Sequence, residues 1–425
     1  MKTRRLGVAA ALVGGALAPG DVSIAGDRIA EVGLAPAGRS RAADRIAAPG
    51  LVDLQVNGFA GVDLLTADSD DAWDHVGRAL LAHGVTAYLP TLITASERDL
   101  AAALRRAARL IDAPAAGARL LGVHLEGPFL SPRRLGVHPA EHRRDPDPAL
   151  AERLLHAGPV AMMTLAPELP GSGALIARLR ERGVTVSLGH SAADAAAVRE
   201  AIAAGASAVT HVFNAMDPIT ARRPGLAGLA LTHRALTAMA ILDGVHLADE
   251  TTRLVLGCAG ERLALVSDAI AAAGGADGAG RADGAGGPEG GDGAGGADGA
   301  GGARGADGEC RLGEAQVTVT DGVARRASDG TLAGGTAPLA SGVRRAVRLG
   351  ATPAAALHAV TRRPAWRVGR ADLGALAPGA PADVVMLDDD LAVRDVLRAG
   401  VLVDRAPGAA SATTRRPERG GRRSS

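Results

Sequence analysis

Two short apolar runs, each ending in a histidine, decide the fold: Val184-Thr-Val-Ser-Leu-Gly-His190-Ser191 and Ala208-Val-Thr-His211-Val-Phe-Asn214-Ala-Met216. Between them, the alanine-rich segment 192–204 has the pattern of a helix. This order predicts a βαβ unit, whose two parallel strands end at the same edge of a sheet. We therefore expect the two histidines to emerge together, at the edge where α/β proteins place their chemistry.

Six further apolar runs, alternating with helical segments, extend this unit in both directions. In chain order, the eight runs are 51–58, 85–92, 120–128, 160–167, 184–191, 208–216, 236–246 and 263–268. Eight continuous apolar strands that alternate with helices predict a (β/α)₈ TIM-like barrel, which we place at residues 49–369.

The chain ends are β-rich and predict a second, smaller unit. Residues 1–48 and 370–408 flank the barrel, so we expect them to form one small β-sandwich domain from both chain ends. Residues 271–309 consist almost entirely of Gly, Ala and Asp and have little to bury, which predicts a disordered insertion. Residues 409–425 are predicted to be a disordered Arg-rich tail.

The first residues allow two interpretations. Basic residues at 2–5 followed by an apolar run at 6–18 are typical of a signal peptide. The alternative is a first β-strand, because residues 19–32 continue as a hairpin with a Gly26-Asp27 turn, and we favour this interpretation. No run reaches the ~18 apolar residues of a membrane helix, so we expect no membrane partner.

Composition sets further limits. The 425 residues are 47% hydrophobic and 1% aromatic, so the core must be built from Ala, Val, Leu and Ile. The net charge is +1, and the segment 415–425 holds five Arg and one Glu, which leaves −3 on the rest. We therefore expect no nucleic-acid partner. Cys258 and Cys310 are far apart and form no CxxC pair, which argues against a disulfide framework and favours a cytoplasmic location.

Polar residues recur at the carboxyl ends of the predicted strands. They are Gln55, Asn57, Glu126, His190, His211, Asp243 and Asp268. Taken singly, each could be a solvated strand end or a structural histidine. Together, Glu126, His190 and His211, from strands three, five and six, match a common catalytic zinc set that leaves a fourth position open.

The residues favour one metal ion over two. Strand one ends in Gln55-Val-Asn57, where a binuclear site in such a barrel would have His-x-His. The only lysine is Lys2, so no barrel lysine can bridge two metals. Asp268 could accept a proton from an attacking water and return it to a leaving group, whereas its structural alternative is a helix N-cap.

Further residues could bind an anionic substrate. Asn214, Ala215, Arg222 and His246 supply donors that suit a phosphate. His138, which follows a Gly-Val pair, is a candidate for contacting the reacting carbonyl or a sugar.

Several motifs in a fixed order carry a family resemblance. They are His124-Leu-Glu126-Gly-Pro128, Thr164-Leu-Ala-Pro167-Glu168, Gly189-His190-Ser191, Thr210-His211-Val-Phe-Asn214-Ala-Met216, Asp243-Gly-Val-His246 and Ser267-Asp268-Ala269. This set resembles the N-acetylglucosamine-6-phosphate deacetylases of the amidohydrolase superfamily. The similarity covers most of residues 19–403, the Gly-rich insertion excepted.

The resemblance implies roles for individual residues. Glu126, His190 and His211 would bind one divalent metal ion per subunit, zinc, with iron, cobalt or manganese as alternatives. Asp268 would be the general base and acid, with His138 near the acetamide carbonyl. Asn214, Ala215 and His246 would bind the sugar phosphate, and Arg222 would reach the phosphate of a neighbouring subunit in a homodimer.

The expected activity is hydrolysis of the N-acetyl group of N-acetylglucosamine 6-phosphate in amino-sugar metabolism. The alternatives are a related substrate such as N-acetylgalactosamine 6-phosphate and a non-catalytic scaffold. Two departures from the family stand out. The insertion 271–309 replaces a short loop, and Gly335 occupies a position where a hydroxyl residue is expected.

Overall fold

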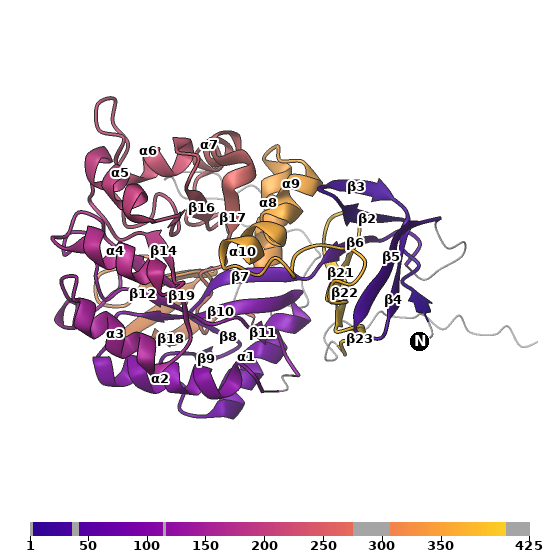
Figure 1. Cartoon of the computed structure of the whole chain (residues 1–425), viewed down its shortest axis with the longest axis horizontal. Helices are drawn as coiled ribbons and strands as arrows, with labels where there is room; N and C mark the ends of the chain where they lie inside the picture. Colours follow the sequence, from indigo (N-terminus) through magenta and orange to yellow (C-terminus); the bar gives the residue numbers. More distant parts are fainter. Residues whose placement is uncertain (1–2, 36–41, 114–115, 275–306, 405–425) are drawn as a thin grey trace, which may run out of the picture.

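The computed structural model describes residues 3–35, 42–113, 116–274 and 307–404. A barrel of strands surrounded by helices forms the larger body, and a β-rich domain lies at its side (Figure 1). That domain contains the indigo N-terminal strands and the yellow C-terminal strands, so segments from both chain ends lie side by side.

The barrel contains the eight strands that the sequence predicts. They are β7 (Leu51–Val56), β10 (Val85–Ile93), β12 (Val123–Glu126), β13 (Val160–Leu165), β14 (Thr185–Leu188), β15 (Ala208–Val209), β16 (Thr237–Ala240) and β17 (Leu263–Leu265). All neighbouring pairs from β7 through β10 and β12 to β17 are parallel. A short strand, β11 (Arg119–Leu120), pairs with β10 just before β12 begins.

The barrel is nearly closed between β17 and β7. A single parallel bridge joins Val56 to Ala269 at the carboxyl ends. Lower down, the N–H groups of Leu265 and Val52 donate to the carbonyls of Ala359 and Val360, at 2.8 and 2.7 Å. A segment following α9 (Pro353–His358) therefore fills the gap between the first and last strands.

Burial explains why these runs are apolar throughout. Every residue of β7 and of β10 is buried, because the helices cover one face and the barrel interior the other. Alternate residues serve the two sides: Val52, Leu54, Ala87 and Leu89 pack together in one cluster, whereas Tyr88 belongs to the larger cluster shared with the helices.

The helices follow the strands in order. They are α1 (Asp70–Ala82), α2 (Glu97–Leu110), α3 (Pro148–Ala157), α4 (Ser172–Glu181), α5 (Ala195–Ala204), α6 (Gly225–Thr232), α7 (Asp249–Ala259), α8 (Leu339–Arg348), α9 and α10 (Arg362–Arg367). Helix α2 shows how the sequence specifies such a helix. Ser96 caps its N-terminus, and Leu100, Leu104 and Ala107 form its buried stripe.

The small domain is a two-sheet β structure, as predicted. One sheet holds β1 (Thr3–Arg5), β4 (Asp21–Ala25) and β5 (Arg28–Leu34); the other holds β2 (Ala10–Val13), β3 (Ala16–Pro19), β6 (Ile46–Pro49), β21 (Val384–Leu387), β22 (Val393–Arg398) and β23 (Val401–Leu402). Apolar side chains from both sheets share one core. The apolar run at 6–18 contains two short paired strands, β2 and β3, where one strand was expected, and β4 and β5 form the hairpin predicted at Gly26-Asp27.

A three-stranded sheet follows the predicted insertion. It consists of β18 (Gly308–Leu312), β19 (Ala315–Thr320) and β20 (Val323–Arg326).

The limits set for the insertion were too wide. Residues 271–274 are ordered, since Ala271 and Ala273 are buried and their carbonyls accept from Gly61 and Ala60 at 2.7 Å. Residues 307–309 are also described, with Gly308 and Glu309 in β18, so 275–306 is the part of the predicted insertion that lies outside the described residues, as does the tail 409–425. The other domain limits remain predictions.

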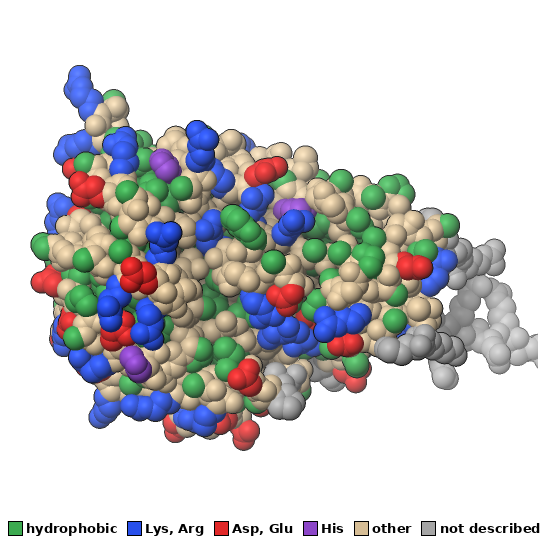
Figure 2. All heavy atoms as spheres, viewed as in Figure 1, with side chains coloured by type: hydrophobic (Ala, Val, Ile, Leu, Met, Phe, Trp, Pro, Cys, Tyr) green, Lys and Arg blue, Asp and Glu red, His purple; other side chains and the backbone are tan. Residues whose placement is uncertain are grey.

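The surface is mixed in character. On the face shown in Figure 2, basic side chains are scattered among acidic and apolar ones and do not gather into one stripe. No helix in the described parts of the chain is long and apolar enough to cross a membrane.

Candidate active site

A cavity of about 300 Å³ opens at the carboxyl ends of the barrel strands. Its lining contains most of the residues predicted from the sequence: Asn57, Glu126, His138, His190, His211, Asn214, Ala215, His246 and Asp268. Because these residues follow six different strands, only the closed parallel sheet brings them together.

Three ligand atoms form a compact triangle. Oε1 of Glu126 lies 2.8 Å from Nε2 of His211 and 3.1 Å from Nε2 of His190, and the two histidine nitrogens are 3.1 Å apart. Tetrahedral zinc with bonds near 2.0–2.2 Å would hold such atoms about 3.3 Å from one another. The three residues therefore fit a divalent metal ion with a small outward adjustment.

Hydrogen bonds fix the orientation of one ligand. The carbonyl of Arg134 can only accept, so Nδ1 of His190, 2.9 Å away, carries a proton, and Nε2 faces Glu126, where its lone pair would be available to a bound metal ion. Nδ1 of His211 is buried and has no partner among the described residues.

The electrostatics suit a cation. Burial opposes the ionisation of Glu126, but hydrogen bonds from His190 and His211 hold its pKa well below the ordinary value. Burial likewise disfavours a charged His211, yet Glu126 raises the pKa of that imidazole. An anionic carboxylate thus lies between two imidazoles, and a bound metal ion would take the place of the protons that their Nε2 atoms donate to Glu126.

The backbone is strained where these side chains emerge. The φ angle is +48° at His190, +28° at His211, +78° at Phe213, +50° at Ala215 and +50° at Asp268. Non-glycine residues rarely adopt this region, and each costs on the order of 1–3 kcal/mol. The surrounding packing sustains these turns, which direct the ends of strands toward the barrel axis.

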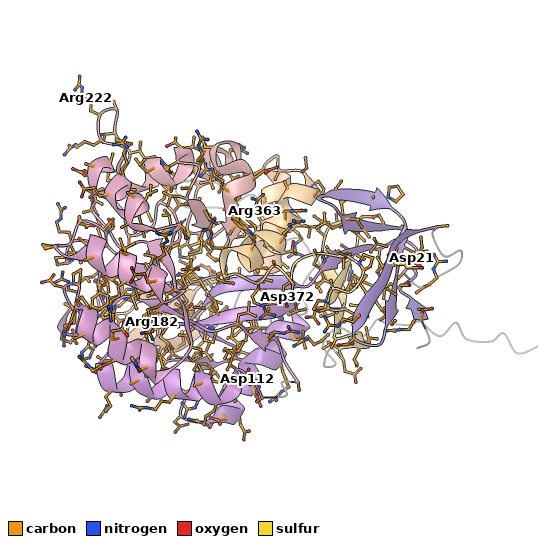
Figure 3. All side chains as sticks on the ribbon, viewed as in Figure 1. Asp21, Asp112, Arg182, Arg222, Arg363 and Asp372 are labelled. Atoms are coloured by element: carbon orange, nitrogen blue, oxygen red, sulfur yellow. The ribbon has the colours of Figure 1, made fainter. Side chains whose placement is uncertain are left out.

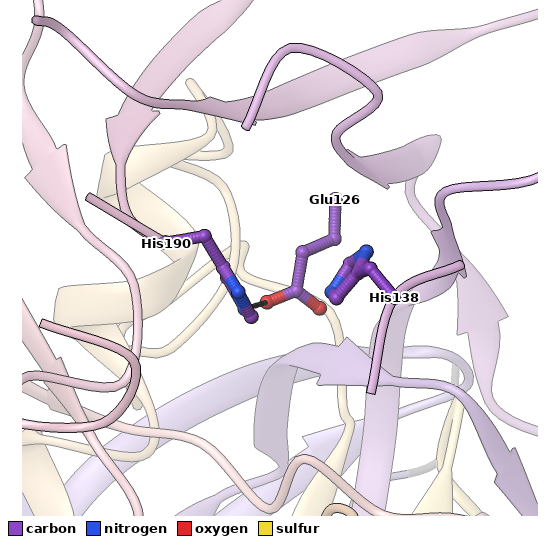
Figure 4. A group of neighbouring side chains, drawn as sticks. All are labelled: Glu126, His138 and His190. Carbon is purple, nitrogen blue, oxygen red and sulfur yellow. Dashed lines mark hydrogen bonds and ion pairs between the residues drawn. The ribbon is translucent and has the colours of Figure 1, made fainter. Parts of the chain in front are cut away.

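His138 competes for a place in the ligand set. One ligand atom each from Glu126, His138 and His190 lies within 4.8 Å of the others (Figure 4). However, the backbone N–H of Thr94 lies 3.2 Å from Nδ1 of His138 and can only donate, so the proton of the neutral ring is on Nε2. Burial lowers the pKa of His138 well below its ordinary value, so the ring is neutral. We therefore assign it as a hydrogen-bond donor and prefer His211 as the third ligand.

Asp268 is held in place by two amide side chains. Nε2 of Gln55 and Nδ2 of Asn57 both donate to its Oδ1, at 2.9 and 2.8 Å, which leaves Oδ2 free of these two donors. Burial raises the pKa of Asp268 to about 6, and the charge of Glu126 adds to the effect. No helix in the described chain begins at Asp268, so the N-cap alternative is wrong.

A chain of buried hydroxyls supports the site from below. Nδ1–H of His124 donates to the carbonyl of Leu54 at 3.0 Å, so its Nε2 must accept from Thr164 at 2.7 Å. The hydroxyl of Thr164 then accepts from Thr210, which accepts from Ser187, both at 2.6 Å. Five barrel strands are tied together one layer beneath Glu126, His190 and His211.

The remaining predicted residues divide into two groups. Asn214, Ala215 and His246 line the cavity, and Asp243 holds Nδ1 of His246 at 2.8 Å. Arg222 does not line it: it is exposed at the tip of a projecting loop (Figure 3).

Sequence reasoning missed several lining residues. Ile93, Arg133, Leu312 and Leu332 also line the cavity. The two leucines come from the segment after the insertion, and no local motif marked them. Gly335 is explained by space, because a Cβ there would lie 2.2 Å from the carbonyl oxygen of Ser267.

The fold and the site define a barrel hydrolase of the amidohydrolase family, to which the chain belongs, since a model of the Amidohydrolase family matches residues 46–407. The resemblance drawn from the motifs is confirmed by more specific relatives. Human N-acetylglucosamine-6-phosphate deacetylase is 35% identical over 85% of this chain and 84% of its own length. N-acetylgalactosamine-6-phosphate deacetylase of Escherichia coli O157:H7 is 35% identical over 83% of this chain and 86% of its own.

Solved structures agree with these relatives. A mutant of N-acetyl-D-glucosamine-6-phosphate deacetylase from Mycobacterium smegmatis, in complex with N-acetyl-D-glucosamine-6-phosphate, is 36% identical with a TM-score of 0.81. The match covers 95% of this chain and 100% of that one. The Thermotoga maritima deacetylase matches at 29% identity and a TM-score of 0.79, over 95% of this chain and 100% of its own.

Proposed function

We propose that the chain hydrolyses the N-acetyl group of N-acetylglucosamine 6-phosphate, giving glucosamine 6-phosphate and acetate. One observation carries the proposal: the Glu126, His190 and His211 triangle and the buried Asp268 face the same cavity. The names of the relatives point to the same chemistry.

The three ligands would hold one divalent metal ion, zinc, with iron, cobalt or manganese as alternatives. Bound there, the metal supplies Lewis acidity to the carbonyl and lowers the pKa of the attacking water. The nitrogen-rich ligand set favours zinc over magnesium or calcium.

The chain's own groups would move the proton. Oδ2 of Asp268 takes a proton from the attacking water while Gln55 and Asn57 hold Oδ1 in place. A pKa near 6 keeps this carboxylate mostly ionised at neutral pH and still basic enough to accept. Asp268 then protonates the departing amine. Nε2–H of His138 donates to the carbonyl oxygen as negative charge develops on it.

The phosphate would bind at the side of the cavity that Asn214, Ala215 and His246 line. The Asn214 side chain, the backbone N–H of Ala215 and the His246 ring are donors there. Hydrogen bonding to His246 lowers the pKa of Asp243 to about 2 against the effect of burial, so Asp243 remains an anion that orients the ring. We propose that Arg222 reaches the phosphate of a neighbouring subunit in a homodimer, which its exposed loop tip supports.

A second substrate has comparable support. The E. coli relative named for N-acetylgalactosamine 6-phosphate matches as well as the human relative does, so the sugar epimer is open. A scaffold role is disfavoured, because all three ligands and Asp268 are present. Both cysteines are free, which supports the proposed cytoplasmic location.

The test is acetate release from both hexosamine phosphates by purified protein, with bound metal measured in the same sample. We expect turnover with about one metal ion per chain. Metal without turnover would direct the search to another N-acyl substrate. Folded protein with neither would support the scaffold alternative. The homodimer is tested by measuring the size in solution of the native protein and of an Arg222→Ala variant. The dependence of their kinetics on the substrate's phosphate tests the role of Arg222.

A further inference from the structure

One side of the cavity is apolar and is separate from the barrel core. Ile93, Val137 and Leu312 line the cavity there. They belong to a small cluster that also contains Ile270, which follows β17, and Val317 and Val319 of the β18–β20 sheet. Ile93 and Leu312 are each only 3% exposed, so this wall is packed almost as tightly as a core.

The apolar wall faces the side where the phosphate donors lie. In the barrel order, β10 is the second strand and β15 the sixth, so Ile93 and Asn214 follow strands on opposite sides of the barrel. The cavity thus has an anion-binding side and an apolar side, with the ligand triangle and Asp268 between them.

We propose that Ile93, Val137 and Leu312 receive the alkyl part of the substrate's acyl group and restrict it to the size of acetyl. This inference rests on the proposed function. The reacting carbon must lie beside the ligand triangle, within reach of Asp268 and of Nε2–H of His138. With the phosphorylated sugar held at the β15 side, the substituent on the other side of that carbon points to the apolar wall.

Two residues of the wall are sequence neighbours of the carbonyl donor His138 and of Thr94, which holds it. Thr94, which orients His138, directly follows Ile93, and Val137 directly precedes His138. The position of the carbonyl oxygen therefore fixes how much room remains in front of the wall.

The wall has little freedom to retreat. Gly313 turns the chain over Ile93, and a Cβ there would lie 3.2 Å from Cδ1 of Ile93 and 3.1 Å from Cδ2 of Leu65. The N–H of Gly313 donates to the buried carboxylate of Asp63 at 3.0 Å, which holds this turn to strand β9 (Val62–Asp63). A longer acyl chain would have to displace packed side chains.

The experiment compares kcat/KM for the N-acetyl, N-propionyl and N-butyryl forms of glucosamine 6-phosphate. We expect wild type to favour acetyl over butyryl by about 10- to 200-fold. Leu312→Ala should reduce that ratio about tenfold, mainly through faster butyryl hydrolysis. Ile93→Val, a smaller truncation, should shift it in the same direction if Leu312→Ala folds poorly.

Val317→Ala is the matched control, because Val317 packs in the same cluster but does not line the cavity. It should leave the acyl ratio unchanged. If Leu312→Ala and Ile93→Val keep the wild-type ratio of kcat/KM for the acetyl over the butyryl substrate, the wall does not select the acyl group. The same conclusion follows if Val317→Ala shifts that ratio equally. Failure of wild type to release any acyl group would instead overturn the proposed function.

Discussion

Replacing Asp53 by Asn should change how stability depends on pH. Asp53 lies in β7 and is fully buried. Its Oδ1 accepts from the backbone N–H groups of Gln55 and Ser267, both at 3.2 Å, whereas Oδ2 has no partner among the described residues. Burial raises the pKa of this carboxyl from 3.8 to about 7, opposed by its hydrogen bonds.

The magnitude follows from the linkage between proton binding and folding. The folded protein binds this proton more tightly than the unfolded chain does, so the free energy of unfolding falls as the pH rises from about 4 to about 7 and then levels. At 1.36 kcal/mol per pKa unit, the full cost above pH 7 is about 4 kcal/mol. Between pH 5 and pH 8, the loss assigned to Asp53 is about 2–3 kcal/mol.

Asp53→Asn removes the titration and keeps the shape. An unsatisfied amide would lower stability by about 1–3 kcal/mol, equally at every pH. The informative quantity is therefore the difference in free energy of unfolding between variant and wild type, measured by urea titration at pH 5 and pH 8. From pH 5 to pH 8, the free energy of unfolding of the variant should rise relative to that of wild type by about 2–3 kcal/mol.

The exposed Asp112, changed to Asn, serves as the control and should show no such trend. A difference between Asp53→Asn and wild type that stays constant from pH 5 to pH 8 would refute the reasoning, since it would mean that Asp53 ionises alike in both states.

Three further substitutions test the site and its frame. Asp268→Asn should lower kcat about 100- to 10,000-fold while metal content is kept; retained turnover would remove Asp268 from proton transfer. Thr164→Val interrupts the buried hydroxyl chain at His124 and Thr210 and should lower the free energy of unfolding by about 1–3 kcal/mol in urea, with Thr164→Ser as the conservative control. Arg262 donates to the carbonyls of Ala230, Leu231, His233, Leu236 and Cys258, so Arg262→Ala should cost about 2–4 kcal/mol, and a thermal melt within error of wild type would contradict this.

Much of the barrel could be predicted because its strands carry two independent signals. Continuous apolar runs mark strands buried on both faces, and polar residues at the carboxyl ends of six of the eight runs mark the edge. Glu126, His190 and His211 were found this way. Their convergence needed only the strand order, which parallel βα repeats dictate.

The finer assignments depend on partners that are distant in sequence. His138 and His190 are both buried beside Glu126, and what separates them is the partner of Nδ1: a donor from Thr94 in one case and the carbonyl of Arg134 in the other. No local pattern reveals such a partner. The same holds for Leu312, which reaches the cavity only because the β18–β20 sheet folds over the barrel edge.

The loop after β12 has two functions: it holds His190 in place and it carries His138. Its Ser131 and Arg134 make two hydrogen bonds to His190, through the N–H of Ser131 to the His190 carbonyl at 3.0 Å and through the Arg134 carbonyl, and the same loop carries His138. Ordering this loop would therefore prepare the proposed metal ligand His190 and the proposed substrate donor His138 in one step. Linkage is reciprocal: if metal binding raises substrate affinity through this loop by some factor, substrate binding raises metal affinity by the same factor. The enzyme would hold its metal most tightly while substrate occupies the cavity.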